Sequence, residues 1–311
     1  MVSEVMRVLV WSFRSLVQGL RAISGVSLGV LLAFAVWGLP AWAGPQQLGV
    51  LTDALGRGQL SERVASFPNW TTKPPVKVSE GDLVYPEWFE GTWDMTSTLV
   101  DMVAPLAPDV VTPGFEGNRQ FLDQPITAPI RFVRKPVESG RFLGQAIKAK
   151  EKVVSDRSFN GLSLARAYLG DEAVEDVKVD PENPNRQITF LQGRHQLSST
   201  VTGRLVEQES GDDFTTTEVF QQFFGGDRPT IYLNEVENTT AYHYYAPGDG
   251  DEMSSANAPT VATGHITADQ ITAIYLSPQD PDYFKALDKP VALYRYQLEL
   301  IPTLDASPTL D

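Results

Sequence analysis

The stretch Tyr85-Pro-Glu-Trp-Phe-Glu-Gly-Thr-Trp93 places two tryptophans, a phenylalanine and a tyrosine around a single glycine. It leads directly into the segment 92–101, in which every second residue from Trp93 onward shares one face. That alternation is typical of a β-strand with one buried face. An aromatic-rich Gly-x-Trp entry into a first strand predicts a closed antiparallel barrel. We interpret Trp93 as a structural plug at one end of that barrel.

The rest of the chain is also rich in strand patterns. Strands are expected at 126–133, 149–159, 187–191, 195–207, 214–224, 230–245, 264–276 and 291–301. Regular alternation of strands and helices is missing, so the chain is predicted to be mainly β, an antiparallel barrel of about eight to nine strands. An N-terminal helix at 46–64, a short helix at 161–170, a long loop at 103–124 and an acidic turn region at 171–186 complete the prediction.

The N-terminal segment has the pattern of an export signal. Arg7, Arg14 and Arg21 precede an apolar core at 26–37, and Ala41-Trp42-Ala43 is a small-x-small cleavage site. The alternative is a single membrane anchor, but the apolar core is shorter than the roughly 20 residues that span a bilayer. We therefore expect a cleaved signal peptide at 1–43, a helix and proline-rich connector at 44–82, a barrel domain at 83–303 and a tail at 304–311.

Composition excludes several classes of protein. The formal net charge is −14, which repels nucleic acid and anionic membrane surfaces. The chain has no cysteine, so a disulfide framework, thiolate catalysis and thiolate metal sites are all excluded. The fold must therefore be held by a core of its own, which a domain of this size can provide.

The tryptophan motif carries a resemblance to a known family. Gly91-Thr92-Trp93, preceded by Trp88, resembles the first signature of the lipocalins and their calycin relatives. The resemblance implies that the tryptophan closes one end of the barrel and that an arginine of the last strand packs over it. Arg295, within Ala292-Leu-Tyr-Arg-Tyr-Gln-Leu-Glu-Leu300, is the expected partner of Trp93.

A wider resemblance covers most of the chain beyond the leader. The opening stretch at 85–93, Pro113-Gly-Phe-Glu-Gly-Asn-Arg119 and Tyr275-Leu-Ser-Pro-Gln-Asp-Pro-Asp-Tyr283 are similar to an uncharacterised family of cyanobacteria and plastids. That resemblance implies the thylakoid lumen or the periplasm as the location. It implies no activity and no catalytic residues.

Catalytic motifs are not found in the sequence. There is no Gly-x-Ser-x-Gly elbow, and the three histidines lack the spacing of metal ligands. An enzyme inside the barrel would need converging groups, such as His243 and Glu235. Asp249-Gly-Asp-Glu252 resembles part of a calcium loop but lacks the full ligand series, so a structural turn is favoured. We expect no enzymatic activity, no cofactor and no metal.

Six residues are candidates for contacting a ligand. Phe115 and Arg119 lie in the loop near the predicted barrel entrance, where they would gate a ligand; the alternative is that Glu116 and Arg119 pair to order the loop. The other four are aromatic residues on predicted strands, which would line a pocket or, alternatively, form a packed sheet face: Phe132, Tyr232, Tyr242 and Tyr244.

Two hypotheses of function follow from these observations. The first is an exported lumenal or periplasmic protein that binds a small apolar molecule, such as a lipid, a carotenoid or a tetrapyrrole, because a closed barrel of about eight strands can enclose a ligand. The second is a barrel filled by its own side chains that acts as an assembly or scaffold factor for a photosynthetic membrane complex. Whether the interior is hollow distinguishes the two.

Overall fold

The structure is a computed structural model that describes residues 58–79, 81–112, 114–137, 141–142, 145–146, 150–181, 183, 185–208, 211–226, 232–248 and 264–303. The predicted signal peptide at 1–43, most of the helix predicted at 46–64 and the tail at 304–311 lie outside the described residues. Among the helices that the structure does describe, none is long and apolar enough to span a membrane.

Most elements are antiparallel strands. The strands are β1 (Lys77–Val78), β2 (Gly91–Val103), β3 (Pro125–Val137), β4 (Arg141–Phe142), β5 (Gln145–Ala146), β6 (Lys150–Ser155), β7 (Val174–Val179), β8 (Arg186–Leu191), β9 (His195–Glu207), β10 (Asp213–Gly225), β11 (Tyr232–Tyr245), β12 (His265–Leu276) and β13 (Ala292–Pro302). The α-helices are α2 (Gln59–Ala65), α3 (Arg157–Leu169) and α4 (Tyr283–Ala286), and the 3₁₀ turns are η2 (Glu87–Phe89), η3 (Glu116–Phe121) and η4 (Asp171–Ala173).

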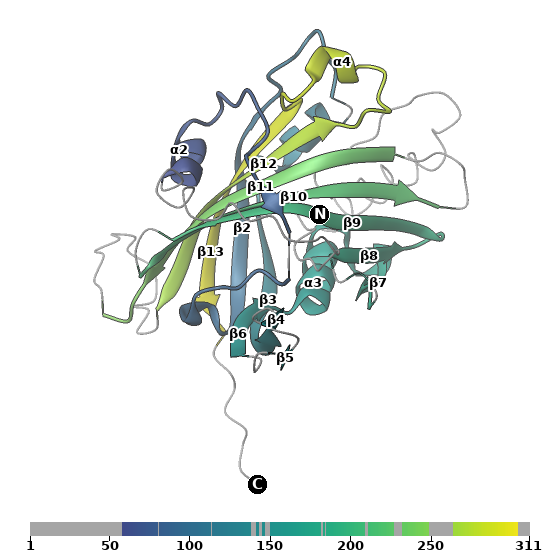
Figure 1. Cartoon of the computed structure of the whole chain (residues 1–311). Coiled ribbons are helices and arrows are strands. Elements are labelled where there is room, and N and C mark those ends of the chain that lie inside the picture. Colours follow the sequence, from purple (N-terminus) through teal and green to yellow (C-terminus); the bar gives the residue numbers. More distant parts are fainter. Residues whose placement is uncertain are drawn as a thin grey trace.

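One large sheet contains nearly all of these strands. In the described part of the chain its order is β6-β3-β2-β13-β12-β11-β10-β9-β8-β7, with β1 paired to β9. The sheet curls into a half-barrel (Figure 1). The expectation of a mainly β, antiparallel fold with few helices is confirmed, but the sheet is open and has more strands than the eight or nine expected.

The half-barrel stays open because α3 packs between β3 and the end strand β7. The strand predicted at 149–159 ends at Ser155, and α3 begins at Arg157. Side chains on one face of α3, at positions 162, 165 and 169, pack with β7 and β8. Leu164 packs against the main core, and Tyr168 is buried. The acidic region at 171–186, predicted as turns, contains β7. A helix with two apolar faces therefore takes the place of the strand pairing that would close the barrel.

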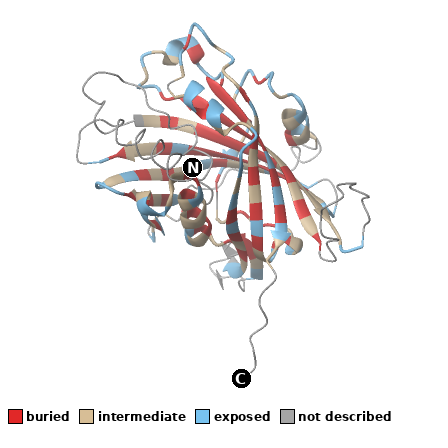
Figure 2. Cartoon of the chain, turned by 180° about the vertical axis from the view of Figure 1, so that it is seen from behind, coloured by how far each residue is buried: buried red, intermediate tan, exposed pale blue. Residues whose placement is uncertain are grey.

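The sheet is buried on both faces mainly along β10, β11 and β12, while along β2 and β9 buried residues alternate with more exposed ones (Figure 2). The main core fills the concave face and includes Trp93, Phe220 and Tyr294. On the convex face, α2 and the connector after it cover a second cluster, formed by Trp70, Ile271, Ala273, Tyr275 and Leu293. The N-terminal helix thus packs on the outside of the sheet.

Gly91 begins the strand that follows the aromatic stretch. Its backbone has φ +128°, a conformation that residues with a Cβ rarely adopt. The chain turns there from η2 into β2, so that Phe89 and Trp93 both face the core. The glycine of the Gly-x-Trp motif is required by this backbone conformation.

Candidate ligand site in the half-barrel

An aromatic cluster fills the concave face at the start of β2. The indole Nε1 of Trp93 donates a hydrogen bond to the carbonyl oxygen of Phe89 at 2.8 Å. The Phe89 ring lies 4.7 Å from the Tyr85 ring and 4.8 Å from the Phe132 ring, between centroids. Trp88 stacks on Phe89 at 4.3 Å. The opening stretch of the sequence therefore forms one packed unit inside the half-barrel.

The predicted contact between Arg295 and Trp93 does not exist. Arg295 lies on the convex face, where its Nε is 2.9 Å from Oδ1 of Asp269 and its guanidinium is 5.6 Å from the centre of the Phe67 ring. Along β13, Tyr294 and Tyr296 point into the core, so the residue between them must point outward. Trp93 faces the opposite side of the sheet.

Two of the six predicted ligand residues lie together. Phe132 and Tyr242 both line a small cavity between α3 and the concave face. Phe115 packs instead against Tyr294, at 5.7 Å between ring centres. Tyr244 stacks on Trp88 at 5.2 Å.

Of the remaining two predicted residues, Arg119 does not line this cavity. The exposed Arg119 pairs with Glu116, with its Nε 3.0 Å from Oε2, as in the alternative in which this pair orders the loop. Tyr232 begins β11, but its side chain lies outside the described residues.

The cavity has a volume of about 70 Å³. Its apolar lining comes from strands β2, β3 and β13 and from α3, and its polar lining from hydroxyl and amide groups. The Tyr168 hydroxyl donates to Oγ of Ser97 at 3.1 Å, and Nδ2 of Asn160 donates to Oγ of Ser155 at 2.6 Å. The lining residues are Met95, Ser97, Ile130, Phe132, Ser155, Asn160, Gly161, Leu164, Tyr168, Tyr242, Gln270, Leu298 and Leu300.

Burial sets the protonation of the tyrosines around this cavity. Burial raises the pKa of Tyr168, while its hydrogen bond to Ser97 opposes the shift. Burial also raises the pKa of Tyr242, and Glu218 adds to the shift. Both phenols are therefore neutral at physiological pH, and the proton of the Tyr168 hydroxyl is donated to Ser97.

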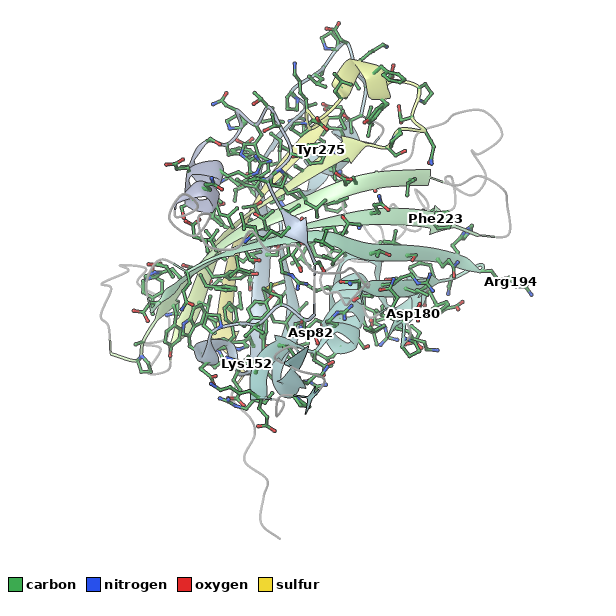
Figure 3. All side chains as sticks on the ribbon, in the orientation of Figure 1. Asp82, Lys152, Asp180, Arg194, Phe223 and Tyr275 are labelled. Atoms are coloured by element: carbon green, nitrogen blue, oxygen red, sulfur yellow. The ribbon has the colours of Figure 1, made fainter. Side chains whose placement is uncertain are left out.

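Charged side chains are also buried inside the half-barrel, outside the lining of the cavity. Nε of Arg204 is 2.6 Å from Oε1 of Glu218, and both side chains are buried. Nη1 of Arg157, at the start of α3, lies 3.7 Å from Oδ1 of Asp82. Asp82 is labelled in Figure 3. Burial lowers the pKa of Arg157 to about 10, with Asp82 and Glu218 opposing the shift. The half-barrel interior therefore contains charged as well as apolar side chains.

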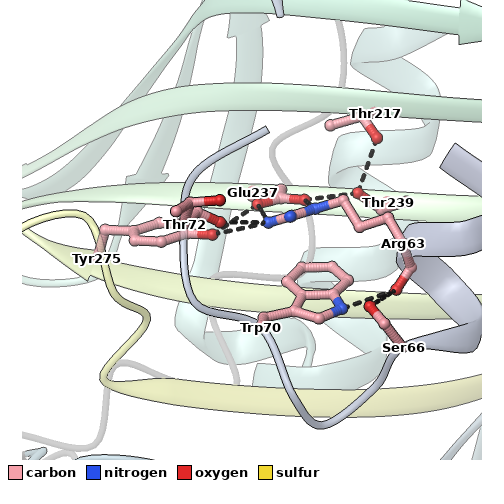
Figure 4. Close-up of polar contacts among 8 residues, drawn as sticks. All are labelled: Arg63, Ser66, Trp70, Thr72, Thr217, Glu237, Thr239 and Tyr275. Carbon is pink, nitrogen blue, oxygen red and sulfur yellow. Dashed lines mark hydrogen bonds and ion pairs between the residues drawn. The ribbon is translucent and has the colours of Figure 1, made fainter. Parts of the chain in front are cut away.

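A second buried ion pair holds α2 on the convex face (Figure 4). Nε of Arg63 lies 2.6 Å from Oε1 of Glu237, and the Tyr275 hydroxyl donates to Oε2 of Glu237 at 2.7 Å. The guanidinium stacks 3.8 Å from the ring centre of Trp70. This network joins α2 and the connector to β11 and β12, and its polar groups satisfy one another.

The histidines have partners outside the cavity. Nδ1 of His243 is 2.6 Å from Oδ1 of Asp213, His265 stacks on Tyr245, and His195 stacks on Phe224. Among the described residues there is no group of three or more histidine, aspartate or glutamate side chains placed to hold a metal ion.

Sequence reasoning missed the polar residues of the concave face, such as Gln222, Asn234 and Gln270. On strands with alternating polarity, polar positions are normally assigned to the solvent face. The only signal that could have identified them is the pattern of β10 and β11, in which both faces mix polar and apolar residues.

The fold and the cavity define a class: an antiparallel half-barrel closed on one side by a helix. Residues 77–303 match the model of a family described as a domain of unknown function, DUF6816. The match covers well over half of the chain and runs from β1 to just past the end of β13, so the chain belongs to this family. No curated protein and no solved structure matches the chain.

Proposed function

We propose that this is an exported binding protein that holds the apolar end of a small lipid-like molecule inside its half-barrel. The observation that supports the proposal is the cavity beneath α3, with aliphatic and aromatic side chains on β2, β3 and β13 and neutral hydroxyl and amide groups beside them. Pockets that combine an apolar lining with a few polar groups are typical of small-molecule sites.

The volume of the cavity narrows the class of ligand. Typical sites for drug-sized ligands are about 300–1,000 Å³, and this cavity is about 70 Å³. A carotenoid or a tetrapyrrole is much larger, so neither fits without displacement of α3. The end of an acyl chain is a better match, with the neutral Tyr168 and Tyr242 hydroxyls in the lining beside it.

Uptake of a fluorescent fatty acid tests this proposal. We expect binding by the purified protein and about tenfold weaker binding by Leu164→Trp, because the larger ring fills space for about two methylene groups worth ~0.8 kcal/mol each. Val111→Trp, at an exposed position, is the matched control and should bind normally. Thermal melts of both variants must first show that they fold. Absence of uptake by the wild-type protein, or equal uptake by both variants, would refute the proposal.

A second candidate function is favoured by one surface feature. Phe284 on α4 is 82 % exposed, and Leu287 and Val111 are also exposed. The loop that carries Val111 lies against the chain just before β13, since the Thr112 hydroxyl donates to the carbonyl of Val291 at 2.7 Å. We name the patch of Phe284, Leu287 and Val111 the α4 patch. Because the chain is acidic, its partner would be a protein with an apolar pocket and a basic rim.

This candidate retains the hypothesis of a scaffold for a photosynthetic membrane complex. Crosslinking followed by purification from cyanobacterial membranes should recover such a complex with the wild-type protein and lose it with Phe284→Ser. Val78→Ser, at an exposed site on β1, should keep it. A freely soluble monomer after crosslinking of the wild type would exclude the scaffold.

A further inference from the structure

Four buried polar side chains form a continuous row across the concave face. Gln187 on β8 is opposite Ser199 on β9, Ser199 is opposite Gln222 on β10, and Gln222 is opposite Asn234 on β11. Directly opposite residues of antiparallel strands point to the same face of a sheet. Gln222 and Asn234 share that face with Phe220 and Val236, which belong to the main core. We call these four residues, which carry three carboxamides and one hydroxyl, the carboxamide row.

The two central amides are buried without hydrogen bonds. Gln222 and Asn234 are each 1 % exposed, and none of their four side-chain nitrogen and oxygen atoms has a hydrogen-bond partner in the described part of the chain. Oε1 of Gln187 is likewise unsatisfied. Since buried polar groups are nearly always hydrogen-bonded, five such atoms in one row require an explanation.

Other buried amides of the interior are hydrogen-bonded. Asn118 donates to the Tyr294 hydroxyl at 3.0 Å, and Asn238 accepts from the Thr272 hydroxyl at 2.7 Å. Asn160 donates to Ser155 and accepts from the backbone of Arg131. Among the buried amides of the described chain, atoms without a hydrogen-bond partner are therefore confined to the carboxamide row.

The surroundings of the row restrict its ligand. On one side the neighbouring row consists of apolar Val201, Phe220 and Val236, and on the other side Leu197 is opposite Phe224. The row itself carries no charge. Each carboxamide offers a donor and an acceptor side by side, which matches a flat group with an adjacent acceptor and donor of its own.

We propose that the carboxamide row binds a neutral, flat molecule with an adjacent hydrogen-bond donor and acceptor, such as a cyclic amide or a nucleobase. The apolar rows on either side would contact its faces, and Gln222 and Asn234 would bind its polar edge. This site is distinct from the acyl-chain cavity, although Gln187 lies close to Gly161, which lines that cavity. Its test therefore does not depend on fatty-acid binding.

The first experiment uses the intact protein and named probes. We expect uracil, adenine or nicotinamide to shift the side-chain amide NMR signals of Gln222 and Asn234 and to raise the melting temperature. The Leu164→Trp variant, which blocks the cavity, should keep this response. If none of the three probes moves these signals, the amides are satisfied by water or by each other and the proposal is wrong.

A pair of variants supplies the second test. The double variant Gln222→Met/Asn234→Leu replaces unsatisfied amides by apolar groups of similar size. Its melting temperature should therefore rise, and its response to the probes should be lost. Asn238→Leu removes an amide that is hydrogen-bonded to Thr272 and should lower the melting temperature. A double variant that melts as low as Asn238→Leu, or that still responds to the probes, would overturn the proposal.

Discussion

Nε of Arg63 lies 2.6 Å from Oε1 of Glu237, and the Glu237 side chain is completely buried on the convex face of the sheet. The Glu237 carboxylate also accepts hydrogen bonds from the hydroxyls of Thr239 and Tyr275, each at 2.7 Å. Arg63 belongs to α2, whereas Glu237 lies on β11. A short helix from the start of the described chain is therefore held to the sheet by a buried ion pair.

Removal of Arg63 should destabilise the protein strongly. Arg63→Ala leaves Glu237 buried without its cation, and breaking a buried pair in this way costs ~3–5 kcal/mol. We expect the lower end of that range because two hydroxyl donors remain. Arg119→Ala, which removes an exposed pair with Glu116, is the control and should change stability far less, because solvent screens such a pair. Urea denaturation measures both, and equal losses would contradict this role for Arg63.

Trp93 should act as a structural residue before it affects any ligand. Its indole is buried and bonded to Phe89, so Trp93→Ala is expected to lower the free energy of unfolding by ~3–5 kcal/mol. Trp88→Ala removes a partly exposed ring and should cost less. Denaturant melts compare the two, and wild-type stability of Trp93→Ala would show that the indole is not a plug.

A double-mutant cycle distinguishes the actual partner of Arg295 from the expected one. Arg295 pairs with Asp269, so the two substitutions should show a coupling energy of ~0.2–1 kcal/mol, as for other solvent-accessible pairs. Arg295 and Trp93 lie on opposite faces of the sheet, so their effects should simply add. Measured coupling between Arg295 and Trp93 would restore the contact that the lipocalin resemblance implied.

Stability should fall at alkaline pH because of buried tyrosines. Burial raises the pKa of Tyr85 and of Tyr296 well above the ordinary value of ~10. Above that pH the unfolded chain loses phenolic protons that the folded chain keeps, so the unfolding free energy decreases as pH rises through ~10. Ultraviolet difference spectra should show these two tyrosines ionising only on unfolding, with Tyr85→Phe and Tyr296→Phe removing part of the effect. An unfolding free energy that does not change above that pH would contradict this expectation.

The sequence predicted most strands because alternation is a local property. The strand predicted at 195–207 has the bounds of β9, and the predictions at 214–224 and 264–276 differ from β10 and β12 by a residue or two. The prediction failed where tertiary packing decides the outcome. The segment 157–159 joins α3 because that helix must bridge β3 and β7, and closure of the barrel depends on which elements fill the gap between the end strands.

The candidate sites were harder to predict than the fold. Phe132 and Tyr242 were identified as aromatic residues on strands, and the structure places both at the cavity. Their meeting depends on register across several strands, which one sequence does not specify. Gln222 and Asn234 were missed because single polar residues on a strand resemble solvent-facing positions, and only the pairing of β10 with β11 brings them together.

Gly161 should be intolerant of a side chain because α3 approaches β7 and β8 closely there. A Cβ at this position would lie 2.7 Å from Nε2 of Gln187 and 2.9 Å from Cγ1 of Val177. Overpacking costs ~1–3 kcal/mol, and the better helix propensity of alanine returns up to ~1 kcal/mol. Gly161→Ala should therefore lose ~1–2 kcal/mol, and adding Gln187→Ala should recover part of the loss. Gly211→Ala, where a Cβ meets no atom within 4 Å, should change stability by less than ~0.5 kcal/mol. Thermal denaturation of the three variants provides the comparison, and a Gly161→Ala protein more stable than wild type would mean that α3 does not pack this tightly against Gln187.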